Sequence, residues 1–235
     1  MKVTDNHKEY LNHLVRLKKD FKIRESVNYA EIVRSDGQKV VSSKNNQFVK
    51  GLYLFAMVNR DIDRYIFDNG YITPYEELPV NYSSDTFDKT KQVVGIDMDN
   101  AYWTVAYLKG YISENTYNKG LEKKEFKPIR LSALSSLGKG KTYKVYEGGE
   151  YKFDQIVKSN IELENFYIDI RYSTYGVLLE IANELGDDFC CWKTDCIYFT
   201  DTKENVDLVR KRLDGFGIKS KIELSSAEKI DKIDE

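Results

Sequence analysis

Residues 93–103 read VVGIDMDNAYW and join a buried strand, a turn and the start of a helix in one short stretch. Because strand side chains alternate between faces, Gly95, Asp97 and Asp99 share one face of the predicted strand. The glycine admits a close neighbour, and two acids without a nearby base are unusual in a core. A helix cap accounts for Asp99 or Asn100 but leaves Asp97 unexplained. Asp97 is what a metal site needs, provided that a partner acid lies elsewhere in the chain.

The composition indicates a soluble, globular protein of one or two domains. The chain has 235 residues, of which 41% are apolar and 31% are charged, and this length suffices for a real core. The formal net charge is −2. A nucleic-acid partner would therefore be met by a local basic patch, because overall charge gives no attraction.

Cysteine and histidine usage argues against a zinc site. The three cysteines, Cys190, Cys191 and Cys196, contain no CxxC pair, and the two histidines lie near the N-terminus. The cysteines are most simply small, buried strand residues in a reducing compartment. We find no signal peptide and no apolar run of membrane-spanning length, so we expect a cytoplasmic protein without a membrane partner.

Hydrophobic periodicity and turn residues predict the order of the elements. Before the central stretch we expect a short helix, a hairpin, a long helix and a polar loop, over residues 5–20, 29–42, 46–68 and 81–91. After it we expect a helix from Asn100 to Leu108, a second long helix, a tight hairpin, a further helix and a last strand, the last four over residues 159–185, 189–199, 201–215 and 218–224.

Residues 119–144 form a basic insert in a slightly acidic chain. Its only acids are Glu122 and Glu125, whereas its basic residues are Lys119, Lys123, Lys124, Lys127, Arg130, Lys139, Lys141 and Lys144. Such a segment could face phosphates, with Lys139, Lys141 and Lys144 as contacts to nucleic acid. A solvated, lysine-rich loop explains the composition equally well.

Asp195, at the tip of the predicted hairpin, is the candidate partner of Asp97. If their strands are antiparallel neighbours, the two carboxylates could hold a pair of Mg²⁺ or Mn²⁺ ions. We expect their carboxyl oxygens to lie about 3–6 Å apart before metal binds. Acids at strand ends and turns are common, so the spacing alone is a modest signal.

The residues around both acids resemble the motifs of family B DNA polymerases. Residues 97–104, DMDNAYWT, are similar to motif A, D-x-x-S-L-Y-P-S, with the acid and the tyrosine kept. Residues 172–176, YSTYG, resemble the end of motif B, K-x-x-x-N-S-x-Y-G. Residues 193–196, KTDC, resemble motif C, D-T-D-S, with the second acid kept. The order and spacing of the three motifs extend the resemblance over roughly residues 90–225.

The resemblance implies roles for individual residues. Asp97 and Asp195 would be catalytic, metal-binding acids. Tyr102 would lie under the sugar of an incoming deoxynucleotide triphosphate and exclude a 2′-hydroxyl, and Tyr175 would line the nascent base pair. The predicted nucleotide-binding residues are Met98, Tyr102, Arg130, Arg171 and Tyr175.

Motif A departs from the family pattern at Asn100, Ala101, Trp103 and Thr104, and three further departures bear on the chemistry. Ile168 stands where motif B has the lysine that meets the triphosphate, and Tyr172 stands where it has asparagine. Lys193 replaces the first acid of motif C, and it either weakens metal binding or neutralises phosphate. Arg171 follows Ile168 by one turn and could supply the missing charge. An ordinary exposed helix arginine is an equally good reading.

We therefore expect an α+β fold built on a palm-like, ferredoxin-like antiparallel sheet with helices on one face. The palm would comprise residues 91–115 and 177–225, and residues 116–176 would form a short, basic fingers-like insertion. Residues 1–90 would be an α/β lead-in, and residues 226–235 a frayed tail. From its length we expect neither an exonuclease domain nor a thumb in this chain.

Two functions of different classes follow from the resemblance. The first is two-metal nucleotidyl transfer on a DNA primer-template, with a second polypeptide as the thumb, in a reduced polymerase typical of a phage or mobile element and acting in the host cytoplasm. The second is a palm without catalysis that binds nucleic acid or assembles a replisome. An unrelated α+β domain whose acids coincide by chance is a third interpretation.

Overall fold

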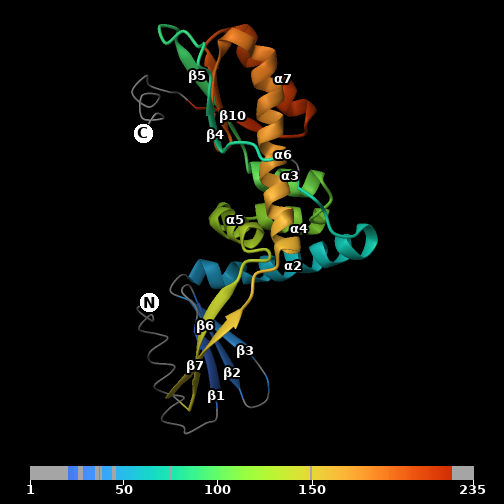
Figure 1. The fold of residues 1–235 in the computed structure, drawn as a ribbon, viewed down its shortest axis with the longest axis vertical. Helices are drawn as coiled ribbons and strands as arrows, with labels where there is room; N and C mark the ends of the chain where they lie inside the picture. The colour runs from blue at the N-terminus through green and yellow to red at the C-terminus, as the bar shows by residue number, and fades with distance from the viewer. Residues whose placement is uncertain are drawn as a thin grey trace. The chain divides into compact units, whose positions relative to one another are not determined.

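A computed structural model describes residues 21–25, 29–34, 37, 39–43, 46–74, 76–148 and 150–223 (Figure 1). The chain divides into two compact units. Unit 1 comprises residues 1–63 and 118–164, and unit 2 comprises residues 64–117 and 165–235. The predicted lead-in over 1–90 and the predicted insertion over 116–176 are each divided between the two units. The predicted helix over 5–20 and the tail over 226–235 lie outside the described residues.

Unit 1 contains a five-stranded antiparallel sheet in the order β3-β2-β1-β6-β7. Its strands are β1 (Phe21–Glu25), β2 (Tyr29–Arg34), β3 (Lys39–Ser43), β6 (Lys141–Glu147) and β7 (Glu150–Val157). The predicted hairpin is confirmed, because β2 and β3 pair on either side of Gly37, whose φ is +80°.

Helices α2 (Asn46–Asn69) and α5 (Lys127–Ser135) pack tightly within unit 1. A Cβ added to Gly51 of α2 would lie 2.4 Å from Cδ1 of Ile129 in α5, so only glycine permits this approach. With α4 (Glu114–Leu121) and the 3₁₀ turn η1 (Lys124–Phe126), these helices show that the basic insert is largely regular structure. The reading of residues 119–144 as a loop is therefore wrong.

Unit 2 is built on a second five-stranded antiparallel sheet, in the order β10-β5-β9-β8-β4. Its strands are β4 (Asn81–Ser83), β5 (Val93–Met98), β8 (Phe189–Lys193), β9 (Cys196–Thr200) and β10 (Ser220–Glu223). Its helices are α3 (Ala101–Leu108), α6 (Ile161–Leu185), which begins in unit 1, the 3₁₀ turn η2 (Gly186–Asp188) and α7 (Lys203–Gly215). The α+β class with antiparallel sheets is thus as expected, whereas the predicted loop over 81–91 includes the short strand β4.

The strand β5, between β10 and β9, separates a packed face from the face that carries Asp97. Val94, Ile96 and Met98 are buried, and α7 packs against this strand. On the other face, a Cβ on Gly95 would lie 2.8 Å from Cε1 of Tyr198. The close neighbour that this glycine admits is therefore the tyrosine ring of β9. No helix within the described ranges is long and apolar enough to cross a bilayer.

Candidate functional site

The end of β5 is tied to both neighbouring strands at the predicted acids. The Met98 N–H donates to the carbonyl oxygen of Asp195 at 2.9 Å, and the Asp99 N–H donates to that of Lys219 at 2.7 Å. The register places Asp97 opposite Cys196 of β9. Strand β5, which carries Asp97, and strand β9, which follows Asp195, are therefore antiparallel neighbours, as expected. The approach of the two carboxyl groups to one shared metal remains a prediction.

Both turns beside these acids hold non-glycine residues in the left-handed region. Asn100, which follows Asp99, has φ +54°, and Thr194, which precedes Asp195, has φ +58°. Within the described part of the chain, no other non-glycine residue has a positive φ. Asparagine tolerates this conformation, but a β-branched threonine is strained in it. Backbone strain of this kind gathers at functional sites, so its position here is informative.

Asn100 occupies the N-cap position of α3, where the sequence predicted Asp99 or Asn100. Its carbonyl oxygen accepts from the Thr104 N–H at 2.9 Å, but its side chain makes no capping hydrogen bond. The helix start is therefore fixed by the backbone turn. Asp97, as expected, takes no part in it.

Lys221 of β10 is a site residue that the sequence did not reveal. Its Nζ lies 2.8 Å from Oδ2 of Asp97 and 3.8 Å from Oδ1 of Asp99. The hydrogen bond to Asp97, and then the charge of that carboxylate, raise the pKa of Lys221. The Asp97 side chain is 19% exposed, so it is reachable from solvent while it is paired. Only the strand register shows that Lys221 stands opposite Asp97.

Tyr102, Tyr167, Arg171 and Tyr175 form one cluster on α3 and α6. The hydroxyls of Tyr102 and Tyr175 lie 3.1 Å apart, and Nε of Arg171 donates to the Tyr175 hydroxyl at 3.4 Å. The Arg171 guanidinium lies 6.0 Å from the centre of the Tyr167 ring. Arg171 and Tyr175 therefore share one face of α6, as the motif B spacing predicted.

The pKa of the Tyr102 hydroxyl is raised by burial and by several further causes, one of which is the charge of Asp195. Burial raises the pKa of Tyr102 most, followed by the hydrogen bond to Tyr175 and the negative charges nearby, including that of Asp195. Tyr102 thus stays protonated and can donate a hydrogen bond at neutral pH.

Three predicted nucleotide contacts lie in settings that do not suit the role. Tyr175 has 0% exposure, so it cannot line a base pair in this conformation. Met98 is buried, and its N–H is taken by Asp195. Arg130 is only 5% exposed and donates to the Gly120 carbonyl oxygen at 2.6 Å within unit 1. We assign Arg130 a structural role, since both its charge and its donor point into that unit.

The three lysines predicted to contact nucleic acid belong to unit 1, whereas Asp97 and Asp195 belong to unit 2. Lys144 alternates with the buried Tyr143 and Val145, so it lies on the exposed face of β6. Lys141 is on the opposite face of the same strand, and the exposed Lys139 precedes it. These lysines therefore do not form one continuous face.

The described residues contain no group of three or more His, Cys, Asp or Glu side chains arranged to hold a metal ion. Magnesium is commonly held by one or two carboxylates, with water and substrate phosphates completing the shell. Two carboxylates such as Asp97 and Asp195 would suffice for a site of this kind.

The three cysteines are buried thiols, as expected from the sequence. Burial raises the pKa of Cys196 to about 12, so its thiol is protonated at neutral pH. Its Sγ donates to Oε2 of Glu223 at 3.6 Å. A buried, protonated thiol of this kind is typical of strand packing.

Comparison of the chain with family models, curated proteins and solved structures gives no match. Function is therefore inferred from the residues of the chain.

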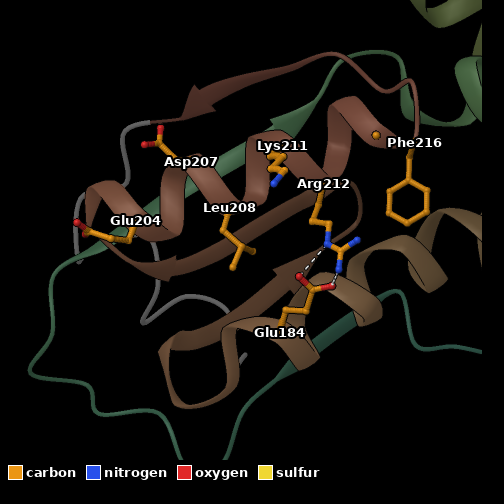
Figure 2. A pocket seen from close by; sticks show the side chains of 8 residues that line it. Glu184, Glu204, Asp207, Leu208, Lys211, Arg212 and Phe216 are labelled. Atoms are coloured by element: carbon orange, nitrogen blue, oxygen red, sulfur yellow. Dashed lines mark hydrogen bonds and ion pairs between the residues drawn. The ribbon is translucent and has the colours of Figure 1, made fainter.

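A hollow of about 750 Å³ lies between α6 and α7, away from the predicted site residues (Figure 2). Figure 2 shows the Arg212 guanidinium reaching the Glu184 carboxylate, with Nε 2.8 Å from Oε2. The residues that line the hollow are Glu184, Glu204, Asp207, Leu208, Lys211, Arg212, Gly215 and Phe216. Because acids and bases are mixed and paired here, the hollow favours neither an anion nor a cation.

Proposed function

We propose that unit 2 is a polymerase-like palm that transfers deoxynucleotides to a DNA primer with Mg²⁺. The observation that carries this proposal is the hydrogen bond from the Met98 N–H to the Asp195 carbonyl oxygen, which brings both acids to adjoining strand ends. The positive φ of Thr194 supports it, because this strained residue directly precedes Asp195.

The connectivity of unit 2 supports a palm. Its main elements follow the order β5, α3, α6, β8, β9, α7 and β10. The four main strands are arranged β10-β5-β9-β8, with β4 added at the edge. If α3 and α6 together count as the first crossover, this is the β-α-β-β-α-β order of ferredoxin-like domains.

The residues of this chain would act as binding and positioning groups. Mg²⁺ would activate the primer hydroxyl and offset the charge of the transferring phosphate. Asp97 and Asp195 would hold it, after Lys221 releases Asp97. Arg171 would leave the Tyr175 hydroxyl and contact the triphosphate. Its charge would replace that of the family's lysine, whose position is occupied by Ile168. Tyr102, whose hydroxyl lies 3.1 Å from that of Tyr175, would contact the sugar.

Primer extension tests this proposal. Asp97→Asn and Asp195→Asn should each abolish extension with Mg²⁺ or Mn²⁺, because each removes charge that offsets the transferring phosphate. Arg171→Ala should mainly raise KM for the nucleotide. Asp207→Asn, which removes an exposed acid from α7, is the matched control and should extend like the wild type. The assay includes any thumb-bearing partner, since a bare palm grips a primer poorly.

A palm without catalysis is the second candidate, and the Lys221–Asp97 ion pair favours it. A lysine at 2.8 Å can neutralise the acid where catalysis would need a metal. In that case no extension occurs in the complete assembly, and Asp97→Asn leaves DNA and partner binding unchanged. Lys193→Asp, which restores the family acid, should strengthen metal binding only if the site is catalytic.

A further inference from the structure

A buried polar network joins the end of α3 to α6, outside the residues used above. Nζ of Lys109 lies 2.8 Å from Oδ2 of Asp169 and 2.8 Å from Oγ of Ser173. The Tyr111 hydroxyl donates to the same Asp169 oxygen at 2.7 Å. Asp169 is only 3% exposed. A buried carboxylate is costly unless it is paired, so this network specifies one arrangement of its partners.

The same two segments carry the Tyr102 cluster. Tyr102 lies in the first turn of α3 and contacts Tyr175, whereas Lys109 follows the last residue of α3 and contacts Asp169. Since the chain numbers rise on α3 while they fall on α6, the two helices run antiparallel. At 1.5 Å per residue, the two attachments are separated by about 10 Å along each helix. Two attachments at this spacing fix both the sliding and the rotation of α3 on α6.

We infer that the Lys109–Asp169 pair is a positioning device that holds Tyr102 in place and thereby sets the preference for deoxyribonucleotides. The selectivity part rests on the proposed function. A sugar with a 2′-hydroxyl is excluded only if the tyrosine ring stands within about an ångström of its proper place. An ion pair with two further hydrogen bonds resists helix sliding better than apolar packing, which tolerates alternative registers.

The test compares Asp169→Asn and Lys109→Met with Lys109→Arg, which keeps the charge. The double variant Lys109→Met/Asp169→Leu removes both charges and retains packing, which guards against misfolding from an unpaired buried acid. Arg212→Met breaks the exposed pair with Glu184 and is the matched control. Circular dichroism and urea unfolding establish that each variant is folded.

Two signals are measured on the full chain. The first is the ring ¹³Cζ resonance of site-specifically labelled Tyr102 without nucleotide. The second is the ratio of Kd values for dATP and ATP with Mg²⁺. We expect Asp169→Asn and the double variant to shift or broaden the Tyr102 signal and to lower the deoxy preference by roughly tenfold or more. Lys109→Arg and the control should keep both.

A folded Asp169→Asn or double variant with an unchanged Tyr102 signal overturns the inference. A changed signal with unchanged selectivity overturns its selectivity part. If the wild type binds neither nucleotide, the proposed function and the selectivity part fail together, while the Tyr102 resonance still decides whether the pair positions the ring.

Discussion

At the scale of single residues, the chain places backbone strain directly before Asp195, one of its two candidate acids. Thr194 keeps a left-handed conformation although a β-branched side chain disfavours it by roughly 1–2 kcal/mol. Its N–H donates to the Val80 carbonyl oxygen at 3.0 Å, so the neighbouring segment holds the turn in this shape. The strain is compatible with a turn selected to aim Asp195 and not to stabilise the hairpin.

Thr194→Gly should therefore raise the free energy of unfolding by about 0.5–1 kcal/mol, since relief of strain exceeds the entropy cost of glycine. Urea denaturation measures this change. Thr202→Gly is the control, because Thr202 has an ordinary φ of −125° and caps α7. It should lower stability by a few tenths of a kcal/mol. Equal losses in both variants would contradict strain at Thr194.

At the scale of elements, β5 and β9 fit together through a glycine. The ring of Tyr198 occupies the space where a side chain on Gly95 would stand. The register that pairs Gly95 with Tyr198 also places Asp97 opposite Cys196, directly after the β8–β9 turn.

Gly95→Ala should lower the free energy of unfolding by about 1–3 kcal/mol, because the new methyl group overpacks the Tyr198 ring. Gly176→Ala is the matched control. It lies inside α6, where an added Cβ meets nothing within 4 Å, so it should stabilise by about 0.5–1 kcal/mol. Urea unfolding compares them, and two changes of the same sign would refute the packing argument.

The strand β6 gives the prediction for nucleic-acid binding. If Lys139, Lys141 and Lys144 face phosphates, the affinity for primed DNA falls steeply with salt. Replacing all three by glutamine should then flatten the logarithmic salt dependence by about two to three units. Fluorescence anisotropy at several salt concentrations measures the slope.

The control for this measurement removes the same charge from α7 by changing Lys203, Arg210 and Lys211 to glutamine. It should leave the slope close to that of the wild type. If the variant with glutamine at positions 139, 141 and 144 has the wild-type slope, these three lysines are solvated and do not contact phosphates.

The elements were largely predictable, because periodicity and turn residues mark them directly. The strand β5, the hairpin β8–β9 and the long helices lie where the sequence indicated. The strand β4 escaped notice because it is short and polar and gains its place only by pairing with β8. Composition likewise could not show that the Arg130 guanidinium is buried and donates to the Gly120 carbonyl oxygen.

At the scale of the whole molecule, the candidate site combines residues that are distant in the chain. Local motifs led to the prediction of Asp97, Tyr102 and Asp195, because each stands in a recognisable turn or helix start. Lys221 and the Lys109–Asp169 pair depend on strand register and helix packing, which a single sequence does not specify. The sequence could therefore predict the acids but not the cation that faces one of them.

The measurement that tests the central claim most directly is Mn²⁺ binding by isothermal titration in the presence of a nonhydrolysable deoxynucleotide triphosphate. The wild type should bind about two Mn²⁺ ions per chain under these conditions. Asp97→Asn and Asp195→Asn should each reduce this binding sharply, and Asp207→Asn should leave it unchanged. Binding that is absent in the wild type, or identical in all four proteins, would contradict a shared metal site at Asp97 and Asp195.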